Sequence, residues 1–244
     1  MPKNDKIYIL FVTIINMNEN QDKTENRNVY KSQSSNNISM HPGDPQGSPD
    51  DCLPCFVFID DGFLAKLSKY FGNGKYLRFD RVLFSNNLAK KENLKCGRIF
   101  YYLAPPFQSD KPSNEERIRK DRHDNFVRSL RDKGAIVREG RCQKIKISEN
   151  NFKYCQKAVD SLIIIDLMSI PIDYPNIRKI ILIASDSDFV PAVEKLKQRG
   201  IEIILYTYYV KKRNTGLSRS NYLLKAVSRY SKITKQDFDD APLT

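Results

Sequence analysis

Two aspartates follow a short apolar run in the second half of the chain. The four apolar residues Ile180–Ile183, three of them β-branched, predict a buried strand. Asp186 and Asp188 come directly after it, and the helix-compatible run that follows ends at Gly200. Ligands of α/β folds bind at the carboxyl ends of strands, and hard divalent cations prefer carboxylate oxygens. Either acid could serve only as a helix N-cap, but a cap needs one acid, so the pair favours a metal site.

Two further acids occupy comparable positions. Asp60 follows the apolar run Phe56–Ile59, which predicts another buried strand. Asp160 stands in an apolar stretch that reads as a mostly buried helix, where a charge is costly unless it is paired or bound to a metal. A salt bridge to a nearby lysine or arginine is the alternative for Asp160. Asp166 lies roughly 240° further round that helix and should face elsewhere.

The elements that must position these acids alternate between strands and helices. Ser113 and Glu116 form a capping-box pattern that opens one helix. The alternation predicts an α/β fold with a mainly parallel sheet covered on both faces. We expect strands at 56–59, 98–104, 180–183 and 201–206, a hairpin of 135–139 with 143–148 around Gly140, and helices at 63–71, 114–133, 154–170, 189–199 and 217–230.

Composition divides the 244-residue chain unevenly. Lys23–Asp51 is rich in Asn, Ser, Gln, Pro and Gly, and buries too little apolar surface to offset its ordering entropy. We therefore expect a disordered or poorly structured segment over residues 1–53, a domain over 54–232 and a tail over 233–244. The net charge is +12, and residues 51–244 alone carry +13. This excess suggests a polyanionic substrate approached through bound cations, although a basic surface could also simply keep a protein in solution.

Cysteine usage and hydropathy bear on the compartment. The five cysteines, an odd number unevenly spread, favour a reducing, cytoplasmic environment over a disulfide framework. Cys52 and Cys55 have metal-ligand spacing but lack a second pair. No stretch approaches the ~18–20 apolar residues of a membrane span, so no membrane partner is expected. The apolar run Ile7–Ile15 follows two lysines like a signal peptide, but no small-residue cleavage site succeeds it.

Three segments carry the acids in a recognisable order. They are Ile59-Asp60 after a strand, Lys157-Ala158-Val159-Asp160 in the middle of the domain, and Ser185-Asp186-Ser187-Asp188-Phe189 before a helix. In order and spacing they resemble the NYN domain, in the LabA-like branch of the PIN-like nuclease superfamily. The resemblance runs from about residue 55 to about residue 230.

This resemblance implies a Rossmann-like α/β/α sandwich and metal-dependent cleavage of RNA. The positions that hold one or two Mg²⁺ or Mn²⁺ ions would be Asp60, Asp160, Asp186 and Asp188. Lys157 matches the family's basic residue before the middle acid. The first motif of the family is often Asp-Gly-x-Asn-Leu, whereas this chain reads Asp60-Asp61-Gly62-Phe63-Leu64 without the asparagine, and Ala158 and Ser185 stand where glycine is usual.

The basic residues suggest where a nucleic acid would bind. Metal ions can activate water and neutralise phosphoryl charge, while lysine and arginine attract the backbone. The altered first motif keeps open a second function, an RNA-binding or regulatory module with weak or no cleavage. His123 is expected at the surface rather than as a general base, and Tyr208 and Tyr209 as packing or stacking residues. Oligomeric state is open, with a homodimer as one option. The candidate RNA-binding residues are Lys157, Lys211, Lys212, Arg213 and Arg219.

Overall fold

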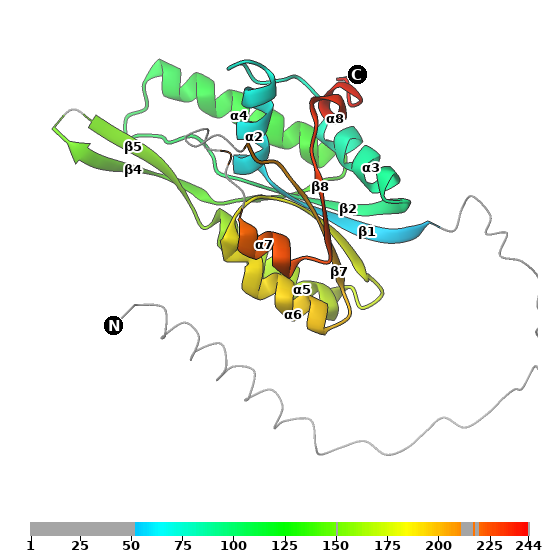
Figure 1. Ribbon diagram of the computed structural model, residues 1–244. Coiled ribbons are helices and arrows are strands. Elements are labelled where there is room, and N and C mark those ends of the chain that lie inside the picture. Colours follow the sequence, from blue (N-terminus) through cyan, green and yellow to red (C-terminus); the bar gives the residue numbers. More distant parts are fainter. Residues whose placement is uncertain (1–51, 150, 211–216, 218–219, 244) are drawn as a thin grey trace, which may run out of the picture. The chain divides into compact units, whose positions relative to one another are not determined.

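A computed structural model describes residues 52–149, 151–210, 217 and 220–243 (Figure 1). The segment predicted to be disordered lies almost wholly outside these residues. The strands are β1 (Leu53–Asp60), β2 (Leu94–Leu103), β3 (Ile136–Glu139), β4 (Arg141–Ser148), β5 (Asn151–Lys157), β6 (Lys179–Ile183), β7 (Glu202–Thr207) and β8 (Arg229–Lys232). The helices are α2 (Asp61–Phe71), α3 (Arg81–Lys91), α4 (Asn114–Asp132), α5 (Val159–Asp173), the 3₁₀ turn η1 (Ser187–Phe189), α6 (Val190–Gln198), α7 (Asn221–Ala226) and α8 (Lys235–Asp239).

Six strands form one parallel sheet in the order β3-β2-β1-β6-β7-β8. The two central strands, β1 and β6, are paired so that Ile59 lies opposite Ile183. Neighbouring parallel strands run in the same direction, so the carboxyl ends of β1 and β6 lie side by side. The predicted mainly parallel α/β sheet is confirmed.

Helices cover both faces of this sheet (Figure 1). Side chains alternate between the faces of a strand, and in β1 the residues Val57 and Ile59 belong to the core under α2, α3, α4 and α8. Phe56 and Phe58 belong to the second core, under α5, α6 and α7. The resulting three layers are the sandwich of a PIN-like fold. No helix among the described residues is long and apolar enough to cross a membrane.

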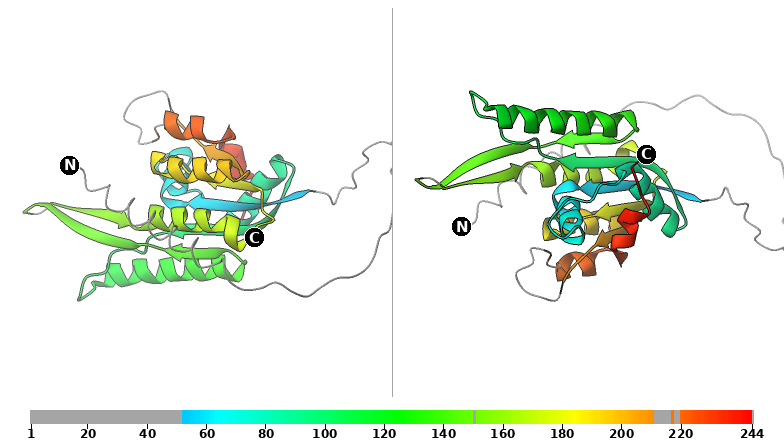
Figure 2. Two further views of the ribbon diagram at one scale, coloured as in Figure 1. Left: turned by 90° about the horizontal axis from the view of Figure 1, so that it is seen from below. Right: turned by 90° about the horizontal axis from the view of Figure 1, so that it is seen from above.

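The expected hairpin of 135–139 with 143–148 is wrong. The first of these segments is β3, which pairs in parallel with β2, and the second belongs to β4, which pairs antiparallel with β5. Together β4 and β5 form a separate two-stranded sheet that projects beyond the main one (Figure 2). Residues 154–157, predicted as helix, are therefore strand, because their backbone groups pair with β4 instead of with the following turn.

Two helix predictions also differ from the structure at their ends. The helix predicted to stop before Pro171 continues to Asp173 as α5. The basic helix expected over 217–230 is instead the short α7 followed by the edge strand β8, and α3 was not anticipated. After β8, Phe238 of α8 is buried against Phe79. The capping box is confirmed: Ser113 Oγ accepts from the Glu116 N–H at 3.2 Å, and Glu116 Oε2 accepts from the Ser113 N–H at 2.9 Å.

Candidate active site

Four predicted acids lie at the carboxyl end of the central strands. Asp60 is the last residue of β1, and Asp186 and Asp188 follow β6, its neighbour in the sheet. Asp160 lies in the first turn of α5. Because Phe56 and Phe58 point toward the α5 layer, the alternation of β1 directs Asp60 to that same layer. The topology therefore brings the acids from three separate segments to one end of the sheet.

Asp60 is the most perturbed of these acids. Burial raises its pKa from the ordinary 3.8 to about 6, and the negative charges of Asp160 and Asp61 act in the same direction. The backbone N–H groups of Phe63 and Gly62 oppose this shift. A carboxylate that is half-buried beside other carboxylates needs a compensating positive charge to stay ionised.

Asp160 interacts electrostatically both with Asp60 and with the two acids that follow β6. Partial burial raises the pKa of Asp160, and repulsion from Asp186 and Asp188 raises it further, whereas Lys66 of α2 lowers it. The expectation of a mostly buried charge was wrong, because α5 begins at Val159 and Asp160 stands in its first turn, only partly desolvated and largely exposed. Among the described residues no lysine or arginine forms an ion pair with Asp160, so the salt-bridge alternative is not supported.

Asp186 also acts as the predicted N-cap. Its Oδ1 accepts a hydrogen bond from the Asp188 backbone N–H at 3.0 Å, at the start of η1. Both residues remain exposed. One cap bond uses only part of the acceptor capacity of a carboxylate, so the cap and a ligand role for Asp186 are compatible.

The chemistry of this donor set suits Mg²⁺ or Mn²⁺, which prefer carboxylate oxygens. A bound cation would relieve the repulsion of Asp160 by Asp186 and Asp188 and that of Asp60 by Asp160. Within the described part of the chain, no three Asp, Glu, His or Cys side chains stand close enough together to hold an ion as they lie. Binding by these four acids would therefore require side-chain rotation at the open end of the sheet.

The predicted basic residues are only partly within the structure. Lys157 is the last residue of β5 and is exposed, three positions before Asp160. Tyr208 packs edge-on against Phe71 and beside Tyr70, which assigns it a packing role. Lys66 was missed by sequence reasoning, since one lysine on a helix gives no signal of what it faces. The candidates Lys211, Lys212, Arg213 and Arg219 lie outside the described residues.

Asp61, the half-buried acid next to Asp60, faces the opposite layer. Burial raises its pKa, while the Tyr101 hydroxyl, which donates a hydrogen bond to Asp61 Oδ1, opposes the shift together with Arg81 and His123. His123 is not the surface residue that was expected, because its side chain is only 10% exposed.

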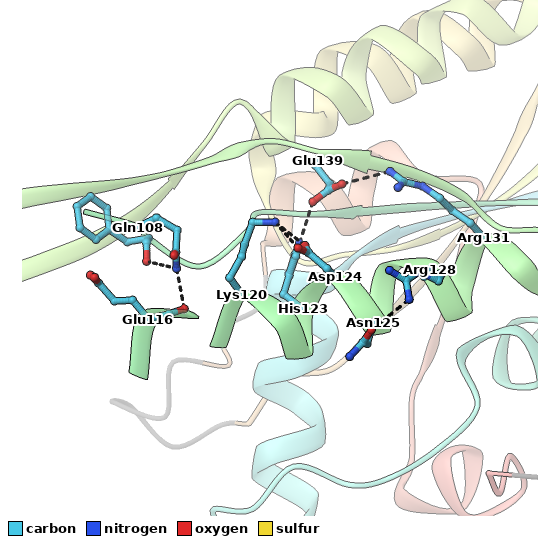
Figure 3. Close-up of polar contacts among 10 residues, drawn as sticks. Gln108, Glu116, Lys120, His123, Asp124, Asn125, Arg128, Arg131 and Glu139 are labelled. Carbon is cyan, nitrogen blue, oxygen red and sulfur yellow. Dashed lines mark hydrogen bonds and ion pairs between the residues drawn. The ribbon is translucent and has the colours of Figure 1, made fainter. Parts of the chain in front are cut away.

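Several charged side chains of helix α4, which carries His123, pair with acids of α4 or β3. His123 Nε2 lies 2.8 Å from Glu139 Oε1, and Arg131 also pairs with Glu139 (Figure 3). Lys120 forms an ion pair with Asp124 one turn along the helix. The charges of Lys120 and Arg131 are therefore partly neutralised by acids of the protein itself.

Comparison with known families identifies this arrangement. A family model described as the NYN domain matches residues 57–232, which is more than half of the chain and spans all four acids. The chain belongs to the NYN domain family. NYN domains are part of the PIN-like nuclease superfamily, in agreement with the six-stranded parallel sheet described above.

Two other comparisons complete the description of this NYN domain. None of the curated proteins searched matches the chain. A crystal structure of a protein of unknown function from Vibrio parahaemolyticus RIMD 2210633 is similar, with a TM-score of 0.50 and 18% sequence identity over 80% of this chain and 98% of that one. At this identity the likeness concerns the fold alone.

Ala158 stands where the family usually has glycine, and its backbone adopts a conformation that is unfavourable for alanine. Ala158 is the N-cap residue of α5 and has φ of 68° and ψ of −2°. This left-handed conformation favours glycine, because a Cβ crowds the following carbonyl. The strained residue lies between Lys157 and Asp160, where it sets the direction in which α5 leaves β5.

Proposed function

We propose that this NYN domain is a metal-dependent ribonuclease that hydrolyses RNA phosphodiester bonds at Asp60, Asp160, Asp186 and Asp188. The observation that carries the proposal is the electrostatic coupling of these acids at the carboxyl ends of β1 and β6. The negative charges of Asp186 and Asp188 raise the pKa of Asp160, and the charge of Asp160 raises the pKa of Asp60. Four carboxylates that repel one another at the ligand-binding end of an α/β sheet are suited to bind divalent cations.

The four acids would hold Mg²⁺ or Mn²⁺ through their carboxylate oxygens. When bound, such an ion lowers the pKa of a water and neutralises charge on the phosphoryl oxygens. Lys66 of α2 supplies positive charge beside Asp160, and Lys157, at the end of β5, stands three positions before Asp160. Their role is to hold the RNA backbone against the acids through phosphate contacts.

Two observations favour a second function, RNA binding with weak or no cleavage. No three described ligands are arranged to hold an ion without rotating. The first motif also lacks the family's asparagine, and Phe63, which stands in its place, is buried in the core. Direct assay of cleavage separates the two functions.

The test is cleavage of a labelled single-stranded RNA with Mg²⁺ or Mn²⁺, with and without EDTA. Changes to groups that merely orient metal ligands cost about 10–100-fold, so Asp186→Asn, which removes a ligand but keeps a cap acceptor, should reduce the rate by at least that factor. Asp173→Asn is the matched control, because Asp173 is an exposed acid at the far end of α5, about 20 Å from Asp160 along the helix axis. Metal-stimulated cleavage by wild type and Asp173→Asn but not by Asp186→Asn supports the ribonuclease. Tight binding with no cleavage under either metal supports the second function.

Two finer assignments follow the same proposal. We place the domain in the LabA-like branch because of its Asp186-Ser187-Asp188-Phe189 turn. We also propose a cytoplasmic location, supported by the free state of all five cysteines, since thiols persist in reducing compartments. Whether the protein forms a homodimer, the option that the sequence left open, is tested by size-exclusion chromatography with light scattering.

A further inference from the structure

The hairpin of β4 and β5, residues 141–157, is here named the arm. It projects from the body of the domain (Figures 1 and 2), and its two strands contain five basic residues and no acid. None of the five forms an ion pair with a residue that the structure describes. A two-stranded ribbon is marginally stable alone in water, so an arm of this charge is suited to an anionic partner. The five residues are Arg141, Lys144, Lys146, Lys153 and Lys157.

One face of the arm combines two of these bases, Lys144 and Lys146, with aromatic rings. In the antiparallel register, Lys144 lies opposite Tyr154 and Lys146 lies opposite Phe152. Directly opposed residues project to the same face, and so do residues two apart on one strand. The other face carries Ile145 opposite Lys153. The face with Tyr154 and Phe152 is here named the aromatic face.

The rings of the aromatic face are exposed and held in place. Phe152 is 42% exposed and Tyr154 is 55% exposed. Lys144 Nζ lies 4.1 Å from the centroid of the Phe152 ring and 5.6 Å from that of Phe107. The Phe107 and Tyr154 centroids are 5.6 Å apart. Lys144 lies over one face of the Phe152 ring and holds it in place, and the exposed remainder of Phe152 and Tyr154 is available for stacking.

A cavity of about 200 Å³ opens at the base of the aromatic face. It is smaller than the roughly 300–1,000 Å³ of small-molecule sites, so it suits a single ring better than a whole cofactor. Arg119 of α4 brings a positive charge to its wall. The lining residues are Pro106, Phe107, Arg119, Cys142 and Tyr154.

The aromatic face leads directly to the candidate active site. Gln156 continues the alternation of Phe152 and Tyr154 on β5, at steps of about 7 Å. A Cβ on Gly62 would lie 3.2 Å from Gln156 Oε1 and 3.0 Å from Asp60 Oδ1. The side chains of Gln156 and Asp60 therefore both lie close to Gly62, so one face of the arm runs from exposed rings toward the first acid.

We propose that the aromatic face of the arm is a stacking platform for single-stranded RNA, which it leads to Asp60. The proposal rests on the ribonuclease function for the identity of the ligand. Proteins that bind single strands combine basic grooves with rings on which successive bases stack. Phe152 and Tyr154 would stack bases, and Lys144 and Lys146 would face the phosphates. An A-form duplex keeps its bases stacked on one another and so gains nothing from these rings.

The test is RNA binding without cleavage, measured by fluorescence anisotropy of a labelled 12-nucleotide single strand in EDTA. Stacking on an aromatic side chain contributes about 1–3 kcal/mol per base, so Phe152→Ala and Tyr154→Ala should each weaken binding by about 5- to 150-fold. Tyr154→Phe keeps the ring and should bind like wild type. Lys144→Gln should lower the salt dependence by about 0.7 in log–log slope. Ile145→Ala, on the opposite face, is the matched control.

The outcomes separate this proposal from the ribonuclease function. Loss of binding in the alanine variants, with Ile145→Ala and Tyr154→Phe unchanged, supports the platform even if wild type never cleaves RNA. Equal affinities across all variants overturn the platform even if wild type cleaves with Mn²⁺. Equal binding of single-stranded and duplex RNA by wild type also overturns it. Circular dichroism of each variant shows whether the fold is retained, and the Tyr154→Phe result distinguishes a lost ring from a disrupted arm.

Discussion

Replacing Asp60 by asparagine should stabilise the metal-free protein while removing its activity. Asparagine has nearly the same shape as aspartate and keeps an acceptor for the backbone N–H groups at the start of α2. It removes a negative charge that is half-buried and repelled by Asp160 and Asp61. We expect the gain only where the wild-type carboxylate is ionised, so the effect depends on pH.

The magnitude follows from the pKa of Asp60, which is raised from 3.8 to about 6. Each pKa unit corresponds to about 1.4 kcal/mol, so the ionised group costs the folded state about 3 kcal/mol at most. Well below pH 3.8 the group is protonated in both states, and wild type carries no penalty. Between about pH 4 and pH 6 the folded state retains a proton that the unfolded state releases, so wild-type stability falls as pH rises. Above pH 6 the full penalty is present.

The assay is urea unfolding of wild type and Asp60→Asn in EDTA at pH 4 and pH 8, with Asp173→Asn as a control for the loss of one charge. The difference in unfolding free energy between Asp60→Asn and wild type should be small at pH 4, about 0.5 kcal/mol. At pH 8 it should favour the variant by about 1–3 kcal/mol. An Asp60→Asn variant that is no more stable than Asp173→Asn at pH 8 would refute the reasoning that Asp60 is an electrostatic burden on the fold.

Three other expectations concern the same end of the sheet. Ala158→Gly should stabilise the protein by about 0.5–1 kcal/mol in urea unfolding, because it relieves a left-handed alanine at some cost in backbone entropy; a loss of stability would contradict this. Gly140→Ala should destabilise by about 1–3 kcal/mol, because its Cβ would lie 2.5 Å from the Lys157 carbonyl oxygen, and an unchanged unfolding midpoint would show that the arm can shift. Mn²⁺ at 100 times its Kd should stabilise wild type by about 2.7 kcal/mol in thermal unfolding and Asp160→Asn by much less; equal shifts would exclude Asp160 as a ligand.

The central part of the fold was predictable from sequence because its signals are local. Ile180–Ile183 and Phe56–Ile59 are continuous apolar runs, which parallel strands buried on both faces require. The position of the acids directly after these runs was therefore enough to assign them to the carboxyl end of a sheet. The capping box of α4 was equally readable, since Ser113 and Glu116 satisfy each other within one turn.

The arm and the sheet edges were not predictable from sequence because their strands depend on pairing with distant segments and not on local signals. Residues 151–157 are exposed on both faces apart from a half-buried Cys155, so they carry no hydrophobic period, and their strand conformation depends on pairing with β4. The edge strand β8 is similarly polar and exposed. The misplaced start of α5 then made Asp160 look buried. The closeness of Gln156 and Asp60 to Gly62 depends on this long-range geometry and has no sequence signal.

The meeting of the two ends of the arm has a consequence for how NYN domains of this kind can diversify. Gly140 and Lys157 are in close contact, so the chain leaves the domain body and returns to it at nearly the same point. Hairpin length can then change without displacing α5 or the acids. Because side chains alternate along each strand, only changes of two residues per strand keep the rings in line with Gln156. Substrate preference could thus evolve in the arm in even steps, while the hydrolytic end of the sheet stays constant.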